Sequence, residues 1–129
     1  MKKLVVIGCL LSLFLPFAHH HAHAQAEPLS DSLFLKVTIV ENGVEYQWEY
    51  SNPDEYEYEH GNKIVKGDQG RRLVSKMFTY LNISPGAEVK DMVAKLKKDG
   101  HEQIDCLDVR WINSEEKLYT WAWKAKNEK

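Results

Sequence analysis

Apolar and polar residues alternate on both sides of an Asn-Gly pair in the segment from Leu35 to Tyr50. Asn42-Gly43 favours a type I′ turn, because both residues tolerate a positive φ angle. With this turn, all large apolar side chains of the two strands fall on one face. The predicted cross-strand pairs are Leu35 with Tyr50, Val37 with Trp48, and Ile39 with Tyr46. The polar residues of the other face are Lys36, Thr38, Glu45, Gln47 and Glu49. The pattern predicts a β-hairpin with one buried face.

A weaker alternation follows the turn cluster Ser51-Asn52-Pro53-Asp54. Residues Tyr56 to His60 alternate like a strand, and Gly61-Asn62 can reverse the chain into Lys63 to Val65. A second hairpin is therefore predicted here, with a long mobile loop as the alternative.

Two amphipathic helices are predicted next. The first opens at residues 67–70, with Asp68 as its N-cap, and ends near Asn82. The second is expected to be capped by Ser84, to carry Pro85 at its first position, and to end at Gly100. The apolar residues at helical spacing are Leu73, Val74, Met77, Phe78 and Leu81 in the first helix and Val89, Met92, Val93 and Leu96 in the second.

Two closing strands are predicted at Ile104 to Ile112 and Leu118 to Lys124. The alternation shifts between Cys106 and Leu107, which predicts a β-bulge there. The element order is ββ(β)ααββ. It predicts an α+β two-layer sandwich, in which an antiparallel sheet of four to six strands carries two helices on one face. We expect this domain to span residues 33–126, after a flexible lead-in at 25–32.

The start of the chain is typical of a secretory signal peptide. A positive Met1-Lys2-Lys3 precedes the apolar stretch from Leu4 to Ala18, and Ala22 and Ala24 form an A-x-A cleavage site. We expect residues 1–24 to be removed, with cleavage after Ala26 as the alternative, which makes the protein secreted or cell-surface. No membrane span remains after that cleavage. The formal charge then changes from −2 to −4, because two lysines and no acidic residue are lost, and this excludes an electrostatic affinity for nucleic acid.

A resemblance to a known family covers much of the chain. The segment runs from Lys63-Ile64-Val65-Lys66-Gly67 to the strand with Leu107, Val109 and Trp111. With its Gly-Asp-Gln-Gly helix entry, His101, and the Ile104-Asp105 strand start, it resembles the YusW-like family of small exported or lipid-anchored bacterial proteins. The resemblance implies export and this fold. The family has no established activity, so no functional residues are implied.

The chain lacks the familiar catalytic and nucleotide-binding motifs, so we expect a non-enzymatic binding domain without a cofactor. Seven acidic residues and no basic one occur between Glu41 and Asn62, which predicts a negative field. The candidate binding residues are Asp54, Glu55, Tyr56, Glu57, Tyr58 and Glu59. Such a surface suits a cationic partner, a cell-wall peptide or Ca²⁺. The alternative is a solubilising edge strand. We expect a monomer whose partner is a cell-envelope or extracellular protein or peptide.

Two other kinds of function remain open. Two of the carboxylates Glu102, Asp105 and Asp108 could serve a small hydrolase, although solvated surface charges are the simpler interpretation. The histidine run at residues 19–23 could bind a metal, but only if the signal peptide is retained. His60 and His101 are expected to be surface or loop histidines, and Cys106 a small buried apolar group.

Overall fold

The computed structural model describes residues 27–127, and the predicted signal peptide and its histidine run lie outside this range. One antiparallel sheet of six strands has the order β4-β3-β2-β1-β5-β6. The elements are the 3-10 turn η1 Leu29–Asp31, β1 Phe34–Glu41, β2 Val44–Ser51, β3 Glu55–His60, β4 Lys63–Lys66, α1 Gly67–Tyr80, α2 Val89–Lys98, β5 Ile104–Ile112 and β6 Leu118–Lys124. The predicted α+β fold is confirmed, with the order ββββααββ.

The first hairpin has the predicted register. Asn42 and Gly43 adopt φ angles of 50° and 74°, and Glu41 faces Val44 directly across the turn. All three predicted apolar pairs are present. The second hairpin also forms, as β3 and β4 around Gly61-Asn62, so the alternative of a long loop is wrong.

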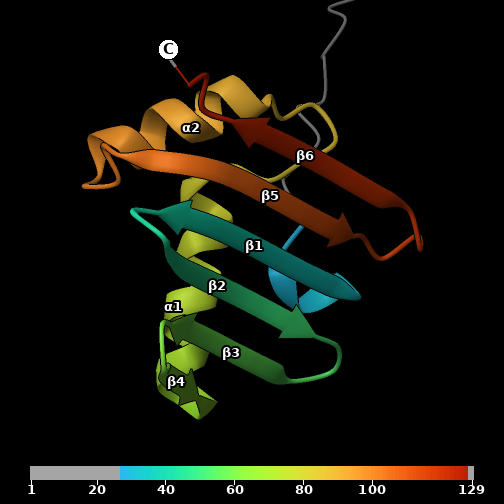
Figure 1. The fold of residues 1–129 in the computed structure, drawn as a ribbon. Coiled ribbons are helices and arrows are strands. Elements are labelled where there is room, and N and C mark those ends of the chain that lie inside the picture. The colour runs from blue at the N-terminus through green and yellow to red at the C-terminus, as the bar shows by residue number, and fades with distance from the viewer. Residues whose placement is uncertain (1–26, 128–129) are drawn as a thin grey trace, which may run out of the picture.

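Both helices lie on one face of the sheet, behind the strands in Figure 1. Helix α1 covers β2, β3 and β4, and α2 covers β5 and β6. The side chains between the two layers form a single core, whose largest fully buried members are Trp111, Tyr50, Leu35, Ile39, Leu81 and Ile83. Each such side chain contributes about 1.5–3 kcal/mol through its burial.

The other tryptophans also face the helical layer. Trp48 is buried, and Trp121 donates its indole N–H to the carbonyl of Ala87 at 2.8 Å. The ammonium of Lys97 on α2 lies 5.3 Å from the ring centre of Trp123. The prediction that both helices pack on one face of the sheet is confirmed, and this face carries the tryptophans.

Helix α1 begins at Gly67, within the predicted opening, but the predicted N-caps of both helices were wrong. Lys66 is the N-cap of α1 and makes no side-chain capping bond, while Asp68 lies within the first turn. Helix α2 begins at Val89, not after Ser84. Its N-cap is Glu88, which makes no side-chain capping bond, and the Ser84 hydroxyl donates to the carbonyl of Asn82. The predicted C-terminus is confirmed: Gly100 has a φ angle of 100°, and the next N–H, of His101, bonds the carbonyl of Leu96.

The irregularity in β5 lies closer to the start of the strand than predicted. Val40 pairs with Cys106 and Glu41 with Ile104, so Asp105 is the extra residue. The Asp105 carboxylate accepts a hydrogen bond from the N–H of Asn42, which holds the bulge against the hairpin turn. The pairing of β5 with β6 is continuous from Cys106 onward.

The described part of the lead-in is packed, in contrast to the expected flexible segment. Leu29 is buried, and so is Ser32. The hydroxyl of Ser32 accepts the indole N–H of Trp111 at 2.8 Å. The folded unit therefore begins before residue 33.

Candidate binding face of the sheet

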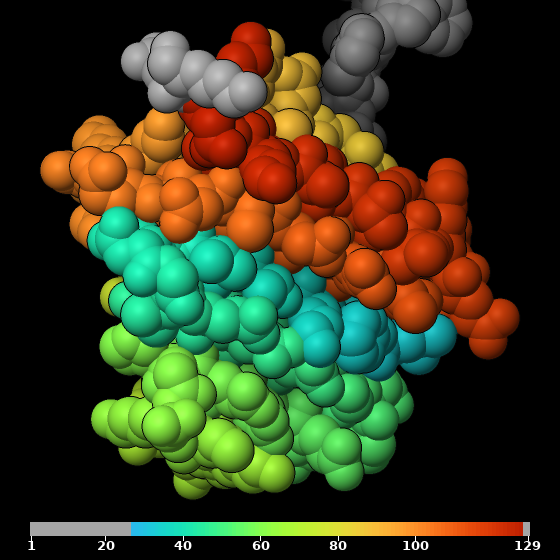
Figure 2. Space-filling view, in the orientation of Figure 1, coloured from blue at the N-terminus to red at the C-terminus, as the bar shows by residue number. Residues whose placement is uncertain are grey.

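The face of the sheet opposite the helices is turned toward the viewer in Figure 2. One cross-strand row on this face runs through β1, β2, β3 and β4 and consists of Lys36, Glu49, Glu57 and Lys66. Its two ion pairs are Lys36 to Glu49 at 3.4 Å and Lys66 to Glu57 at 2.9 Å. Glu49 and Glu57 face each other directly, an arrangement of like charges that opposes pairing of the strands.

A hollow of about 320 Å³ lies at the end of this row. It is lined by Glu49, Ser51, Asp54, Glu55, Tyr56, Glu57, Lys66 and Gly67. Four of these residues carry a carboxylate, and the ammonium of Lys66 is the single opposing charge in the lining. The hollow is therefore concave and negative, which suits a cationic group.

Neighbouring charges shift the titration of the carboxyls beside the hollow. The hydrogen bond from Lys66, followed by that from Glu59, lowers the pKa of Glu57. The hydrogen bond with Glu57, followed by burial and the charge of Glu57, raises the pKa of Glu59. The ammonium of Lys66 has a raised pKa because it bonds to Glu57. Two acidic groups thus lie close together beside one ammonium, and an additional cation would relieve their repulsion.

The two tyrosines of the predicted acidic and aromatic surface lie on the other side of the sheet. Tyr56 is buried, with its ring 4.8 Å from that of Tyr50 and 5.4 Å from the guanidinium of Arg71. The ring of Tyr58 lies 5.2 Å from that of Trp48. The prediction of one surface carrying both residue types was wrong, because neighbouring residues of a strand point to opposite faces. The alternation of residues along this strand, which is visible in the sequence, already indicates that the tyrosines and the glutamates lie on opposite faces.

The four acidic candidates remain accessible. Asp54 and Glu55 are exposed, and Glu57 and Glu59 are half-buried on the outer face. The carboxylate of Asp54 lies 3.9 Å from the guanidinium of Arg71, and both side chains are exposed. Glu49 was absent from the predicted set, because only the register of β2 against β3 places it beside Glu57.

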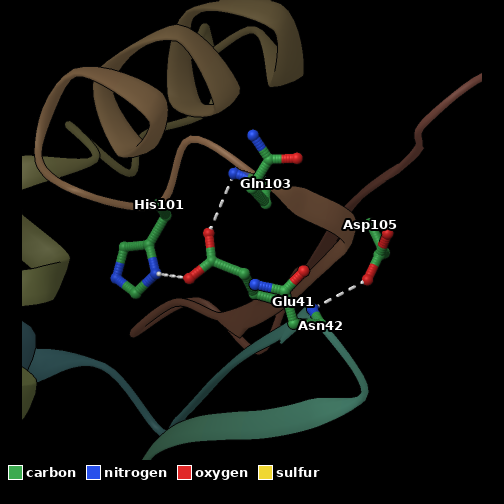
Figure 3. A network of polar contacts seen from close by, with 5 residues as sticks. All are labelled: Glu41, Asn42, His101, Gln103 and Asp105. Carbon is green, nitrogen blue, oxygen red and sulfur yellow. Dashed lines mark hydrogen bonds and ion pairs between the residues drawn. The ribbon is translucent and has the colours of Figure 1, made fainter.

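A second polar site lies at the tip of the first hairpin (Figure 3). The Glu41 carboxylate lies between two partners, with one oxygen 3.4 Å from Nδ1 of His101 and the other accepting the N–H of Gln103 at 3.1 Å. The ring of His101 meets that of Tyr46 edge-on, and His60 stacks on Tyr46 at 4.3 Å. His101 thus lies in the loop between α2 and β5, as one of the two predicted alternatives, and its side chain is half-buried there.

Two of the three carboxylates considered for a hydrolase have separate structural partners. Asp105 binds the N–H of Asn42, and Asp108 on the outer face forms an ion pair with Arg110 at 3.1 Å. Glu102 is exposed in the turn before β5. Cys106 lies half-buried in the outer-face row of β5, whereas His101 packs against Tyr46 on the helix side, so the two do not form a nucleophile and base.

Among residues 27–127, no three His, Cys, Asp or Glu side chains are grouped so that they could hold a metal ion. Within the same residues, neither helix is long and apolar enough to cross a membrane. Comparisons of the chain with protein-family models, curated proteins and solved structures return no match. The resemblance to the YusW-like family therefore stays a prediction, and the function has to be argued from the geometry.

Proposed function

We propose that this protein is an exported binding domain without catalytic activity, and that the outer face of β2 and β3 receives a cationic segment of its partner. The observation that carries this proposal is the hollow in which Glu49, Asp54, Glu55 and Glu57 converge around one lysine. Glu59 adds a fifth carboxyl beside Glu57. We call these five residues the acidic face.

The acidic face contributes little to the core. Its carboxyls are exposed or half-buried, and the apolar side chains of the same strands point to the helices. Exposed ion pairs such as Lys66 with Glu57 contribute only about 0–1 kcal/mol. Several like charges gathered in a concavity instead favour cation binding and speed the encounter with a positive partner.

Export follows from the signal peptide predicted at residues 1–24. The proposed partner is accordingly a lysine- or arginine-bearing protein or peptide of the cell envelope or the surrounding medium. Binding of this kind weakens with salt, because the Debye length is about 8 Å at physiological ionic strength.

The test is partner capture from cell-envelope extracts by the secreted protein. The variant Glu55→Gln, Glu57→Gln, Glu59→Gln removes three charges of the acidic face with little change in side-chain volume, and we expect it to lose capture. The matched control is Glu102→Gln, Glu115→Gln, Glu116→Gln, which changes the charge equally at exposed positions away from β2 and β3. Equal capture by both variants and the unmodified protein would rule out the acidic face.

A further inference from the structure

Strand β6 forms one edge of the sheet and leaves its outer side unpaired within the described residues. The ends of its ladder with β5 show which backbone groups are free. Asn113 donates its N–H to the carbonyl of Lys117, and Ala125 donates to the carbonyl of Asp105. These bonds place the odd-numbered residues of β6 in the hydrogen-bonded pairs with β5. The N–H and C=O groups of the even-numbered residues therefore point outward, at Leu118, Thr120, Ala122 and Lys124.

This edge lacks the devices that usually protect a free strand. Its pairing with β5 is free of bulges from Cys106 to Ile112, and its sequence LYTWAWK contains no proline and no charge on the helix side. The opposite edge differs, because β4 has four residues and a lysine at each end. Of the two edge strands, β6 is the longer and carries one lysine, at its end, so it is the better suited to accept another strand.

The helix-side residues of β6 are also incompletely covered. Tyr119, Trp121 and Trp123 are half-buried although α2 lies beneath them, and Leu118 on the other side is 58% exposed. A strand added at this edge would bury the remaining aromatic surface, which an exported domain otherwise leaves open to water.

We propose that the occupant of this edge is the β6 strand of a second copy, paired antiparallel about a two-fold axis at Trp121. In this register Trp121 faces its counterpart in a non-hydrogen-bonded pair, and Tyr119 faces Trp123 of the second copy. The hydrogen-bonded pairs are Thr120 with Ala122 and Leu118 with Lys124. The outward-pointing backbone groups then bond to one another, and the sheet continues from one copy into the next.

The charges along β6 favour a second copy in this register. Lys124 faces Leu118, so no like charges meet within the paired strands, and the same register brings Lys126 toward Glu116 of the other copy. A two-fold pairing uses the same edge of both copies, so it closes as a dimer. The dimer goes beyond the proposed binding function and departs from the monomer expected from the sequence. It leaves both acidic faces free, because these lie at the other end of the sheet.

The test uses charges at Thr120 and Ala122, which are both exposed on the outer face. In the proposed register each Thr120 faces an Ala122 of the other copy. The double variant T120E/A122E therefore places like charges opposite each other twice, and we expect it to be monomeric. The double variant T120E/A122K places opposite charges there, and we expect it to dimerise at least as well as the unmodified protein. The single variant T120E meets only alanine and should remain dimeric.

Sedimentation equilibrium of the secreted protein, up to about 1 mM, gives the association state of each variant. Far-UV circular dichroism and thermal unfolding of each variant establish that it is folded. A dimer that T120E/A122E dissociates and T120E/A122K retains supports the proposal. An unmodified protein that is monomeric throughout, or open-ended polymers, would overturn it and leave the edge to another extended chain. Loss of the dimer in T120E alone would overturn the register, because in this register the new carboxylate faces only Ala122.

Discussion

Glu41 and His101 are 60 residues apart in the chain, yet Nδ1 of the imidazole lies 3.4 Å from Oε1 of the carboxylate. Their side chains are only 13% and 19% exposed. Because the other oxygen of Glu41 accepts the N–H of Gln103, this one carboxylate ties the tip of the first hairpin to the loop between α2 and β5. The contact joins the end of β1 to the loop that follows α2.

Replacing Glu41 should therefore cost stability. We expect Glu41→Ala to lower the free energy of unfolding by about 1–3 kcal/mol, because the N–H of Gln103 and the ring of His101 lose their acceptor. Glu41→Gln should cost less, since its amide oxygen can still accept one bond. Urea unfolding measures the difference. The control is Glu45→Gln on β2, an exposed glutamate; a cost for Glu41→Ala no larger than for this control would show that the tie is unimportant.

The bond between Ser32 and Trp111 predicts that the lead-in stabilises the fold. In Ser32→Ala the buried indole N–H of Trp111 loses the hydroxyl that accepts it at 2.8 Å. A buried unsatisfied donor costs about 1–3 kcal/mol. Ser30→Ala, at an exposed position of the same turn, should be neutral in thermal unfolding. Equal melting temperatures for the two variants would contradict the packing of the lead-in.

Gly70 of α1 lies close against the backbone of the sheet. A Cβ added there would lie 2.9 Å from the carbonyl oxygen of Val65 and 3.0 Å from that of Tyr56, and both are backbone atoms that cannot easily move away. We expect Gly70→Ala to destabilise the protein by about 1–3 kcal/mol. Gly86→Ala is the matched control, because a Cβ at that position meets nothing within 4 Å. Chemical denaturation of both variants tests the prediction, which fails if Gly70→Ala is as stable as Gly86→Ala.

Within the acidic face, we expect Glu57 and Glu59 to have different pKa values. Bonding to Lys66 and Glu59 lowers the pKa of Glu57, and bonding to Glu57 raises the pKa of Glu59. Folding thus favours ionised Glu57, a contribution that is lost as pH falls through its lowered pKa. Folding favours the protonated form of Glu59. This contribution to the stability of the folded protein is present below the ordinary pKa of the residue and is lost as the pH rises through its raised pKa.

NMR titration of the side-chain carboxyl carbons measures this order. We expect Glu59 to titrate at higher pH than Glu57, and Glu57→Gln to move the pKa of Glu59 downward. If the two residues titrate together in the unmodified protein, or if the pKa of Glu59 is unchanged in Glu57→Gln, the coupling between the two carboxyls is absent.

The first hairpin was predictable from sequence because two independent signals agree. Asn42-Gly43 sets the turn, the alternation of apolar residues sets the faces, and a shift of one residue would have exposed the whole apolar set. The start of α2 was not predictable in the same way. Ser84-Pro85 has the residue types of a helix start, but the Ser84 hydroxyl bonds backward to Asn82.

The candidate site was predicted only in part. The run of glutamates on β3 was identified, whereas Glu49 joins it only through the pairing of β2 with β3. The separation of Tyr56 from its acidic neighbours follows from strand alternation once β3 is known to be a strand. The contact of Glu41 with His101 depends on how the end of α2 meets the hairpin, and no local pattern encodes that distance.

The acidic face is proposed to bind cations, and this binding can be measured in solution. It is tested most directly by titrating ¹⁵N-labelled protein with a lysine-rich peptide and following the amide signals by NMR. We expect the shifts to concentrate on Glu49, Ser51 and residues 54–59, and to disappear at high salt or in the variant Glu55→Gln, Glu57→Gln, Glu59→Gln. Shifts centred on α1 or α2, or no saturable shift at low salt, would contradict the claim.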